Sequence, residues 1–211
     1  MDFLSSEIQE YVENHTSPES DLLKKLNRET HANVMMPRML SGHLQGRVLS
    51  LFSHMLRPKN ILEVGTYTGY SALCMAEGLA EDGVLTTIDV NEELEDMVRG
   101  YFDESPYAEK IKYIIGNAMD VIPSLDISPE LVFIDADKKS NGVYYDMIID
   151  HVPAGGIIMV DNVLWSGKTV EGKVDKKTQL ILDFNSKIHN DDRVENVLFP
   201  VRDGLIVMRK K

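Results

Sequence analysis

The sequence predicts an α/β fold: a Rossmann-like, three-layer α/β/α sandwich with a seven-stranded, mostly parallel sheet. From Asn60 onward, short apolar runs alternate with amphipathic segments of helical spacing. Such runs are typical of strands buried on both faces, and their alternation with helices indicates parallel strands joined by right-handed crossovers. The last two runs are separated only by residues 200–204. A connection that short permits only an antiparallel hairpin, so one antiparallel strand is expected at the C-terminal end.

The individual elements follow from the same patterns in chain order. Residues 1–57 are expected to form N-terminal accessory helices, because apolar residues between Leu40 and Met55 recur at helical spacing. Residues 58–211 are expected to form the core of a single domain that spans residues 1–211. The predicted strands are 61–64, 84–88, 111–115, 131–134, 157–160, 194–199 and 205–208. The predicted helices of the core are 71–79, 92–102, 118–125, 143–149 and 178–188.

The charge balance argues against several classes of partner. Of the 211 residues, 34 are acidic and 22 are basic, so the formal net charge is −12. A chain this acidic repels phosphate backbones and anionic membrane surfaces, so neither nucleic acid nor a membrane is expected as a partner. Cys74 is the sole cysteine, and no apolar run approaches the length of a membrane span. We therefore expect a cytoplasmic protein in which Cys74 packs in the core.

A glycine-rich turn follows the first predicted strand, in the segment Glu63–Ser71. Glycine at such a turn lets the backbone approach a ligand closely, and the helix that follows offers free N–H groups. A nicotinamide dinucleotide motif would need a second glycine where Tyr67 stands, and the charge of Glu63 would lie near the diphosphate. A carboxylate at that place suits a cationic cofactor instead. The alternative is a tight turn without a ligand.

The second and third predicted strands end in residues suited to a nucleoside. Asp89 follows the glycine turn by about 20 residues, where an acid can accept hydrogen bonds from both ribose hydroxyls. A helix N-cap is the equally open alternative for Asp89. Beyond the third strand, Gly116, Asn117 and Ala118 can border an adenine ring. Together with Glu63, these features indicate an adenosine-bearing cofactor without phosphate, and S-adenosylmethionine is the candidate.

Oxygen-bearing side chains end the fourth and fifth predicted strands. Asp135 follows the fourth strand, and Asp161 and Asn162 follow the fifth. Carboxylate and amide oxygens, with room left for water or substrate, favour Mg²⁺ or Ca²⁺, with Mn²⁺ as a further candidate, over zinc. Capping of the following helix or loop is the alternative for each acid. Capping explains less well why two neighbouring strand ends carry acids, one of them with Lys138 three residues on.

Seven segments of the chain form a recognisable set. They are Met39–Ser41, Gln45-Gly46, Leu62–Ser71, Phe133–Lys138, Asp161–Lys168, Asp192-Arg193 and Pro200–Leu205. From about Val34 to the C-terminus, the chain thereby resembles the caffeoyl-CoA and catechol O-methyltransferases. The resemblance implies a class I methyltransferase that depends on S-adenosylmethionine and a divalent cation. It also implies a homodimer, with residues 1–57 as a helical lid and dimerisation segment and the C-terminal hairpin as a further contact.

The resemblance implies a role for each matching residue. The cofactor would contact Ser41, Glu63, Gly65, Thr66, Ser71, Asp89, Asn117, Ala118, Asp135 and Asp137. Glu63 and Asp89 would bind the ribose, and Asp137 would face the amino group of the cofactor. The metal would be held by Asp135, Asp161 and Asn162. Lys138 would be the catalytic base, and the acceptor would be a small phenolic molecule of the catechol type.

The sequence also departs from the family pattern. Asn117 replaces the aspartate of many relatives, Gly142 replaces a tyrosine on the acceptor side, and the loop after Lys168 is shorter than in the plant enzymes. A coenzyme A thioester is therefore not carried over as the substrate. Two alternatives from other classes are a catalytically inactive module that binds S-adenosylmethionine and a nicotinamide-dependent oxidoreductase. Lys138 and the metal ligands oppose the first, and Tyr67 opposes the second.

Overall fold

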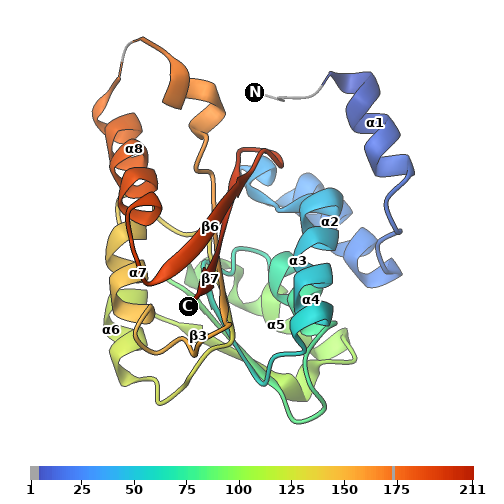
Figure 1. Ribbon diagram of the computed structural model, residues 1–211. Helices are drawn as coiled ribbons and strands as arrows, with labels where there is room; N and C mark the ends of the chain where they lie inside the picture. Colours follow the sequence, from blue (N-terminus) through green and yellow to red (C-terminus); the bar gives the residue numbers. More distant parts are fainter. Residues whose placement is uncertain (1–4, 173) are drawn as a thin grey trace.

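The computed structural model describes residues 5–172 and 174–211 and is built around one seven-stranded sheet (Figure 1). Its strands are β1 (Asn60–Val64), β2 (Val84–Asp89), β3 (Ile111–Ile115), β4 (Leu131–Ile134), β5 (Ile157–Asp161), β6 (Val194–Phe199) and β7 (Leu205–Lys210). Their order across the sheet is β3-β2-β1-β4-β5-β7-β6. The first five strands pair in parallel, and β7 lies antiparallel to both β5 and β6. The predicted sheet and its C-terminal hairpin are therefore confirmed.

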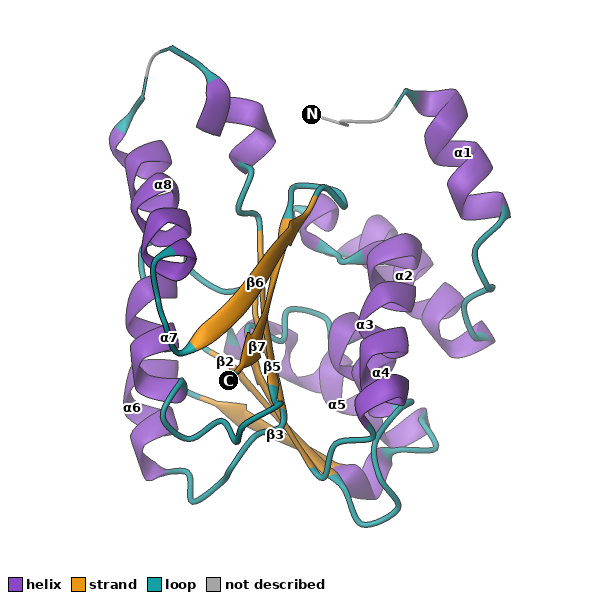
Figure 2. Ribbon diagram, in the orientation of Figure 1, coloured by secondary structure: helices purple, strands orange, loops and turns teal. Residues whose placement is uncertain are grey.

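Helices cover both faces of this sheet and complete the predicted three layers (Figure 2). One face carries α2 (Asp21–Asn33), α3 (Gly42–Leu56), α4 (Tyr70–Ala76) and α5 (Glu95–Glu104). The other face carries α6 (Ala118–Val121), α7 (Asn141–Ile148) and α8 (Lys176–His189). Successive strand residues enter opposite cores: Ile61 packs on the first face, and its neighbour Leu62 packs on the second. Both sides of the sheet are therefore buried, which explains why the strands read as continuous apolar runs.

The N-terminal helices differ in how firmly they join the core. Leu23 and Leu26 of α2 are buried in the cluster that covers the first face. Tyr101 of α5 donates its hydroxyl hydrogen to Glu29 of α2, which adds a polar contact. In contrast, α1 (Ser6–Asn14) has no buried residue and lies at the periphery (Figure 1). A lid and dimerisation role for residues 1–57 stays a prediction.

Short 3-10 helices account for most differences from the expected boundaries. They are η1 (Pro37–Met39), η2 (Glu92–Leu94), η3 (Ala108–Lys110), η4 (Ile122–Ser124) and η5 (Trp165–Val170). The helix expected over 118–125 ends at Val121 and continues as η4, because Pro123 has no N–H to donate to the α-helical ladder. The segment of η5 lies where the sequence predicts no helix.

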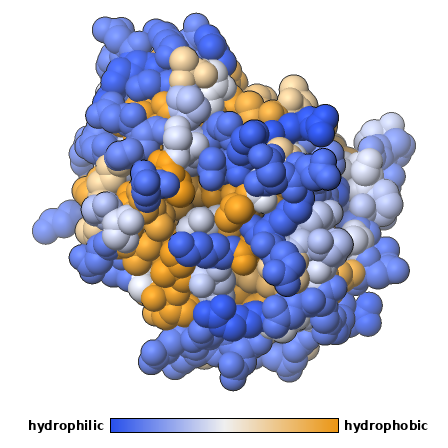
Figure 3. Space-filling view, turned by 90° about the horizontal axis from the view of Figure 1, so that it is seen from below, coloured by the Kyte–Doolittle hydropathy of each residue, from blue (hydrophilic) through white to orange (hydrophobic). Residues whose placement is uncertain are grey.

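The face seen in Figure 3 is mainly hydrophilic, and its hydrophobic residues gather in patches between polar ones. No helix in the part of the chain that the structure describes is long and apolar enough to cross a membrane.

Candidate active site

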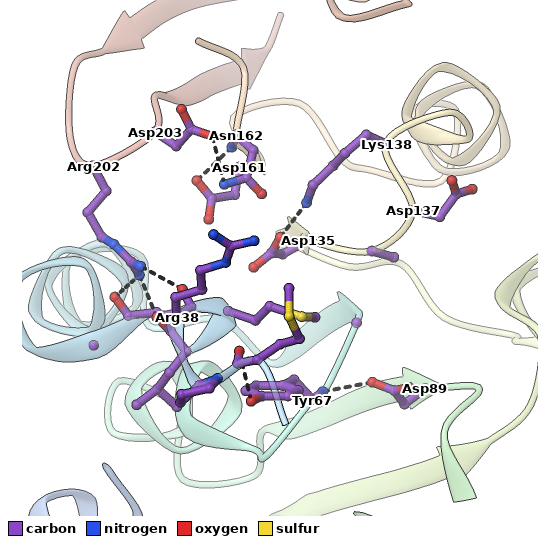
Figure 4. Close-up of a pocket in the computed structure, with 18 of the residues that line it drawn as sticks. Arg38, Tyr67, Asp89, Asp135, Asp137, Lys138, Asp161, Asn162, Arg202 and Asp203 are labelled. Carbon is purple, nitrogen blue, oxygen red and sulfur yellow. Dashed lines mark hydrogen bonds and ion pairs between the residues drawn. The ribbon is translucent and has the colours of Figure 1, made fainter. Parts of the chain in front are cut away.

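A large open cavity lies at the carboxyl ends of the strands, which is where α/β sheets of this kind bind ligands. Its volume is about 1820 Å³, and residues from the ends of β1 to β5, the segment 34–44 and the β6–β7 turn line it (Figure 4). The predicted site residues that line it are Ser41, Gly65, Asp89, Asn117, Ala118, Asp135, Asp137, Lys138, Asp161 and Asn162. One cavity therefore gathers most of the side chains that the sequence singled out.

The glycine turn brings the ends of β1 and β4 into close contact. Gly65 has a φ of +103°, and a Cβ atom there would lie 2.4 Å from the carbonyl oxygen of Asp135. Gly69 has a φ of +86°, and a Cβ atom there would lie 2.7 Å from the ring of Phe102. Only glycine satisfies both the positive φ and the short approach at these positions. Gly65 thus contacts a neighbouring strand on one side and the cavity on the other.

The Asp89 carboxylate is held by two backbone N–H groups at the edge of the cavity. Tyr67 N donates to Oδ2 at 2.7 Å, and Asn91 N donates to Oδ1 at 2.9 Å. One donor belongs to the glycine turn and the other to the turn after β2, so Asp89 joins two strand ends. Each carboxylate oxygen can accept a further hydrogen bond. Asp89 therefore serves as a turn cap, and its position also allows it to accept hydrogen bonds from a ligand.

Three predicted cofactor residues of the glycine-turn segment point away from the cavity lining. Glu63, Thr66 and Ser71 are buried and are not among the described residues that line the cavity. Thr87 Oγ1 donates to Glu63 Oε2 at 2.5 Å, whereas Glu63 Oε1 is buried with no partner among the described residues. Burial raises the pKa of Glu63 to about 8, although the nearby Ser71 and Thr87 hydroxyls act to lower it. A direct contact between Glu63 and a ribose stays a prediction that this buried position does not favour.

The side chains of two other predicted cofactor residues bond to nearby residues of their own turns. The Asn117 side chain accepts a hydrogen bond from Met119 N at 3.0 Å at the start of α6. The Asp137 carboxylate accepts from Lys139 N at 3.2 Å and from the Ser140 hydroxyl. Figure 4 shows the Asp137 carboxylate turned away from Asp135. Asp137 nevertheless lines the cavity, and its contact with a cofactor amino group stays a prediction.

Asp135 and Lys138 form an ion pair at the end of β4. Lys138 Nζ lies 2.6 Å from Asp135 Oδ1, and the Lys138 and Asp135 side chains are about one-fifth exposed, at 22% and 18%. Burial raises the pKa of Asp135, while the positive charge of Lys138 lowers it and the nearby Asp161 raises it again. A partly buried carboxylate beside a second acid gains from a cation placed on its other oxygen, Oδ2.

Asp161 and Asn162 present further oxygens at the end of β5. Asp161 is buried, and its oxygens accept from Asn162 N at 2.7 Å and from Gln45 Nε2 at 2.9 Å. Asn162 Nδ2 points to Asp203 Oδ2 at 3.5 Å, so its amide oxygen is left for other contacts. Figure 4 shows Asp135, Asp161 and Asn162 grouped on one side of the cavity.

This donor set fits a hard divalent cation. It offers two carboxylates and one amide, which are the ligand types that Mg²⁺ takes. Within residues 5–172 and 174–211, no three His, Cys, Asp or Glu side chains gather as a metal site, so Asn162 would have to supply the third ligand. Arg38 also points into this part of the cavity (Figure 4).

The structure adds residues to which the sequence patterns assign no role. Arg202, in the β6–β7 turn, donates to the carbonyl oxygens of Leu40 at 2.7 Å and Ser41. The hydroxyl of Tyr67 contacts the carbonyl oxygens of Met35 and Met36 at 3.2 and 3.3 Å. These contacts fasten the segment 34–41 over the cavity. No pattern in the sequence could have shown them, because they join segments far apart in the chain.

Comparisons with known proteins agree with this arrangement. The family model described as O-methyltransferase matches residues 13–211. The probable caffeoyl-CoA O-methyltransferase 3 of Dictyostelium discoideum is 31% identical, over 99% of this chain and 91% of the relative. The SAH-bound methyltransferase PaMTH1 of Podospora anserina has a TM-score of 0.89 and 26% identity, over 99% of this chain and 97% of that chain. An O-methyltransferase from Bacillus cereus in complex with SAH has a TM-score of 0.88 and 26% identity, over 97% of each chain.

The nicotinamide-dependent alternative finds no support in these matches, whereas the predicted enzyme class is confirmed. The chain belongs to the O-methyltransferase family that includes the caffeoyl-CoA O-methyltransferases.

Proposed function

We propose that this protein transfers the methyl group of S-adenosylmethionine to one hydroxyl of a small catechol-like acceptor and that a divalent cation is required. The methyl donor is supported by the SAH-bound state of two similar methyltransferases and by a cavity edged by Asp89. The observation that carries the acceptor and the cation is the grouping of Asp135, Asp161 and Asn162 beside Lys138.

The reaction is an in-line displacement at the methyl carbon. The bond from carbon to the cofactor sulfur breaks as the bond to the acceptor oxygen forms, and the phenolic proton leaves the acceptor. A phenol has a pKa near ~10 and is a poor nucleophile at neutral pH while it keeps that proton. A divalent cation, when bound at this site, would lower the pKa of the acceptor hydroxyl and so make its oxygen a better nucleophile.

The residues of this chain supply the remaining parts of the reaction. Asp135, Asp161 and Asn162 would hold the cation, with Mg²⁺ as the first candidate and Mn²⁺ or Ca²⁺ as further ones. Lys138, held at the same strand end, would take the phenolic proton after its ammonium group has released one proton to solvent. Trp165 lines the cavity and offers an aromatic wall for the acceptor ring. The segment 34–41 lines the same cavity and would shield the reacting atoms from water as charge is neutralised between phenolate and sulfonium.

The test is a methylation assay with the purified protein. Catechol and caffeate are incubated with S-adenosylmethionine and Mg²⁺, and a monophenol serves as the control acceptor. We expect methylated product from the two vicinal dihydroxy compounds, loss of activity after EDTA treatment and recovery with Mg²⁺ or Mn²⁺. Full activity after exhaustive chelation would contradict the metal-dependent mechanism. Cofactor binding without turnover of any acceptor would favour the inactive binding module.

We also propose that the protein forms a homodimer through the face shared by α3 and the edge strand β6. Leu51 and Met55 of α3 are 60% and 75% exposed, and Val197 of β6 is 56% exposed. The rings of Phe52 and Phe199 meet edge to face with their centroids 6.4 Å apart, so α3 and β6 pack against each other. An exposed edge strand with apolar residues is a template for association.

Light scattering should give the dimer mass, and a monomer at micromolar concentration would contradict the proposal. Cytoplasmic localisation stays a prediction.

A further inference from the structure

Gln45 contacts one of the proposed metal ligands from outside the strand ends. It lies on α3, is fully buried, and donates through Nε2 to Asp161 Oδ2 at 2.9 Å. The two residues are 116 positions apart in the chain. A buried glutamine loses the hydrogen bonds that water would give it, so it needs a partner. Here that partner is a carboxylate at the edge of the active-site cavity.

The contact restrains both oxygens of Asp161. Oδ2 accepts from Gln45, and Oδ1 accepts from Asn162 N at 2.7 Å. With one neutral donor on each oxygen, the carboxylate cannot rotate freely. Each oxygen still has a lone pair for a further partner. This is the arrangement expected of a ligand whose orientation is set before a cation arrives.

Gln45 is itself held in one orientation. Its Oε1 lies 3.5 Å from Arg202 Nη1, so the amide oxygen faces a guanidinium and the amide nitrogen faces Asp161. Arg202 is anchored in turn by the carbonyl oxygens of Leu40, at 2.7 Å, and Ser41. The chain of contacts therefore begins at the β6–β7 turn, passes through α3 and ends on the end of β5.

We infer that Gln45 is a positioning residue that orients Asp161 for the divalent cation, an inference that rests on the proposed function. Removing a side chain that hydrogen-bonds a metal ligand typically lowers the metal affinity by about 10- to 100-fold. Gln45 is buried behind Asp161, outside the set of described residues that line the cavity, so it acts through Asp161 and does not touch the acceptor or the methyl donor. Its loss should therefore weaken the cation and spare the cofactor.

The experiment is a calorimetric titration of Mn²⁺ into protein saturated with S-adenosylhomocysteine. Gln45→Met keeps the size of the side chain and removes the amide donor. We expect a dissociation constant for Mn²⁺ that is about 10- to 100-fold higher and an unchanged dissociation constant for S-adenosylhomocysteine. Gln179→Met is the matched control, because Gln179 also donates to an aspartate, Asp183, at 2.7 Å but on the exposed face of α8. The control should bind Mn²⁺ like the wild type.

The outcomes separate this inference from the proposed function. If the wild type binds no Mn²⁺ or Mg²⁺, the metal-dependent function and the role of Gln45 both fall. If the wild type binds and Gln45→Met binds equally or more tightly, only the role of Gln45 is overturned. An equal loss of affinity for S-adenosylhomocysteine also overturns it, because Gln45 would then support the cavity as a whole. Should Gln45→Met fail to fold, Gln45→Asn keeps the amide but shortens its reach, and the same selective loss is expected.

Discussion

The two halves of the cavity wall are held together in different ways. In the half formed by β1, β2 and β3, Asp89 accepts hydrogen bonds from the backbone of Tyr67 and Asn91, and the contacts lie within consecutive strand-turn units. In the half formed by β4, β5 and the β6–β7 turn, Gln45 and Arg202 act on partners more than a hundred residues away in the chain. We call these the cofactor half and the acceptor half, after the ligands proposed for them. The contacts that hold Asp89 join consecutive strand-turn units, whereas those that hold Asp161 need α3 and the last hairpin to pack beside β5.

Backbone strain follows the same division. Seven residues other than glycine have positive φ among the described ones, and six of them line the cavity: Met36, Tyr67, Asn162, Trp165, Ser166 and Arg202. Tyr67 belongs to the cofactor half and Met36 to the segment 34–44, whereas the other four belong to the acceptor half. Left-handed conformations of such residues persist where surrounding contacts hold them, and they gather at functional sites. The acceptor half therefore depends more on tertiary contacts to keep its shape.

The largest effect on methylation activity is expected from a substitution at Asp161, in the acceptor half. Asp161→Ala removes a proposed cation ligand, and we expect methylation of a catechol to fall by about 10³-fold, or about 4 kcal/mol. Binding of S-adenosylmethionine, measured by calorimetry, should stay nearly intact because Asp89 lies in the other half. Asp150→Ala, at an exposed ion pair with Arg193, is the control and should keep full activity. Parallel loss of both functions would contradict the division into halves.

The next largest effect concerns the buried carboxyl behind the cofactor half. The pKa of Glu63 is raised to about 8 in the folded protein, above its ordinary value of 4.5. The folded state therefore binds this proton more tightly, and stability present below pH ~4.5 is lost as the pH rises through ~8. Glu63→Gln stays neutral, so its advantage over the wild type should grow between pH 5 and pH 8 by a few kcal/mol.

Urea unfolding of the cofactor-free protein at both pH values measures this difference for Glu63. Glu195→Gln is the control, since Glu195 is exposed and its pKa is lowered by Arg209. A Glu63→Gln advantage that does not change with pH would show that the carboxyl is ionised throughout this range.

A smaller effect is expected at Asp89, on the cofactor half alone. Asp89→Ala should weaken S-adenosylmethionine by about 1.5–3 kcal/mol, which is the scale of hydrogen bonds to a charged group. Titration of Mn²⁺ should show no change, in contrast to Asp161→Ala. Asp82→Ala removes an exposed carboxylate paired with Lys59 and is the matched control. Unchanged cofactor affinity in folded Asp89→Ala would remove Asp89 from the binding site.

The smallest effect is expected at Asn117, whose side chain caps a helix while its contact with the cofactor stays a prediction. Because the side chain caps α6 through Met119 N, Asn117→Ala should cost about 1 kcal/mol of stability. In a chain of this size, that lowers the melting temperature by roughly 2–4 °C. Cofactor affinity should change little. The opposite pattern, with a normal melting temperature and weak cofactor binding, would assign Asn117 to the adenine pocket.

The sequence alone determined the alternation of strands and helices, the C-terminal hairpin and the strand ends that carry polar side chains. Burial on both faces forces continuous apolar runs, and the carboxyl ends of parallel strands meet at one edge. For this reason, Asp89, Asp135 and Asp161 could be assigned to one cavity from their positions in the chain. Local rules also identified a helix N-cap as the alternative role of Asp89, but Asn91 is the N-cap of η2, and the hydrogen bond that Asp89 accepts from Asn91 N closes a turn.

Only the tertiary structure decided which residues support that site and which lie behind it. Glu63 and Asp89 are both acids at strand ends, yet one is buried under the glycine turn and the other borders the cavity. The roles of Gln45 and Arg202 depend on α3 and the last hairpin meeting beside β5. Periodicity and turn chemistry report on neighbours in the chain, whereas these contacts join segments that only the packed sheet brings together.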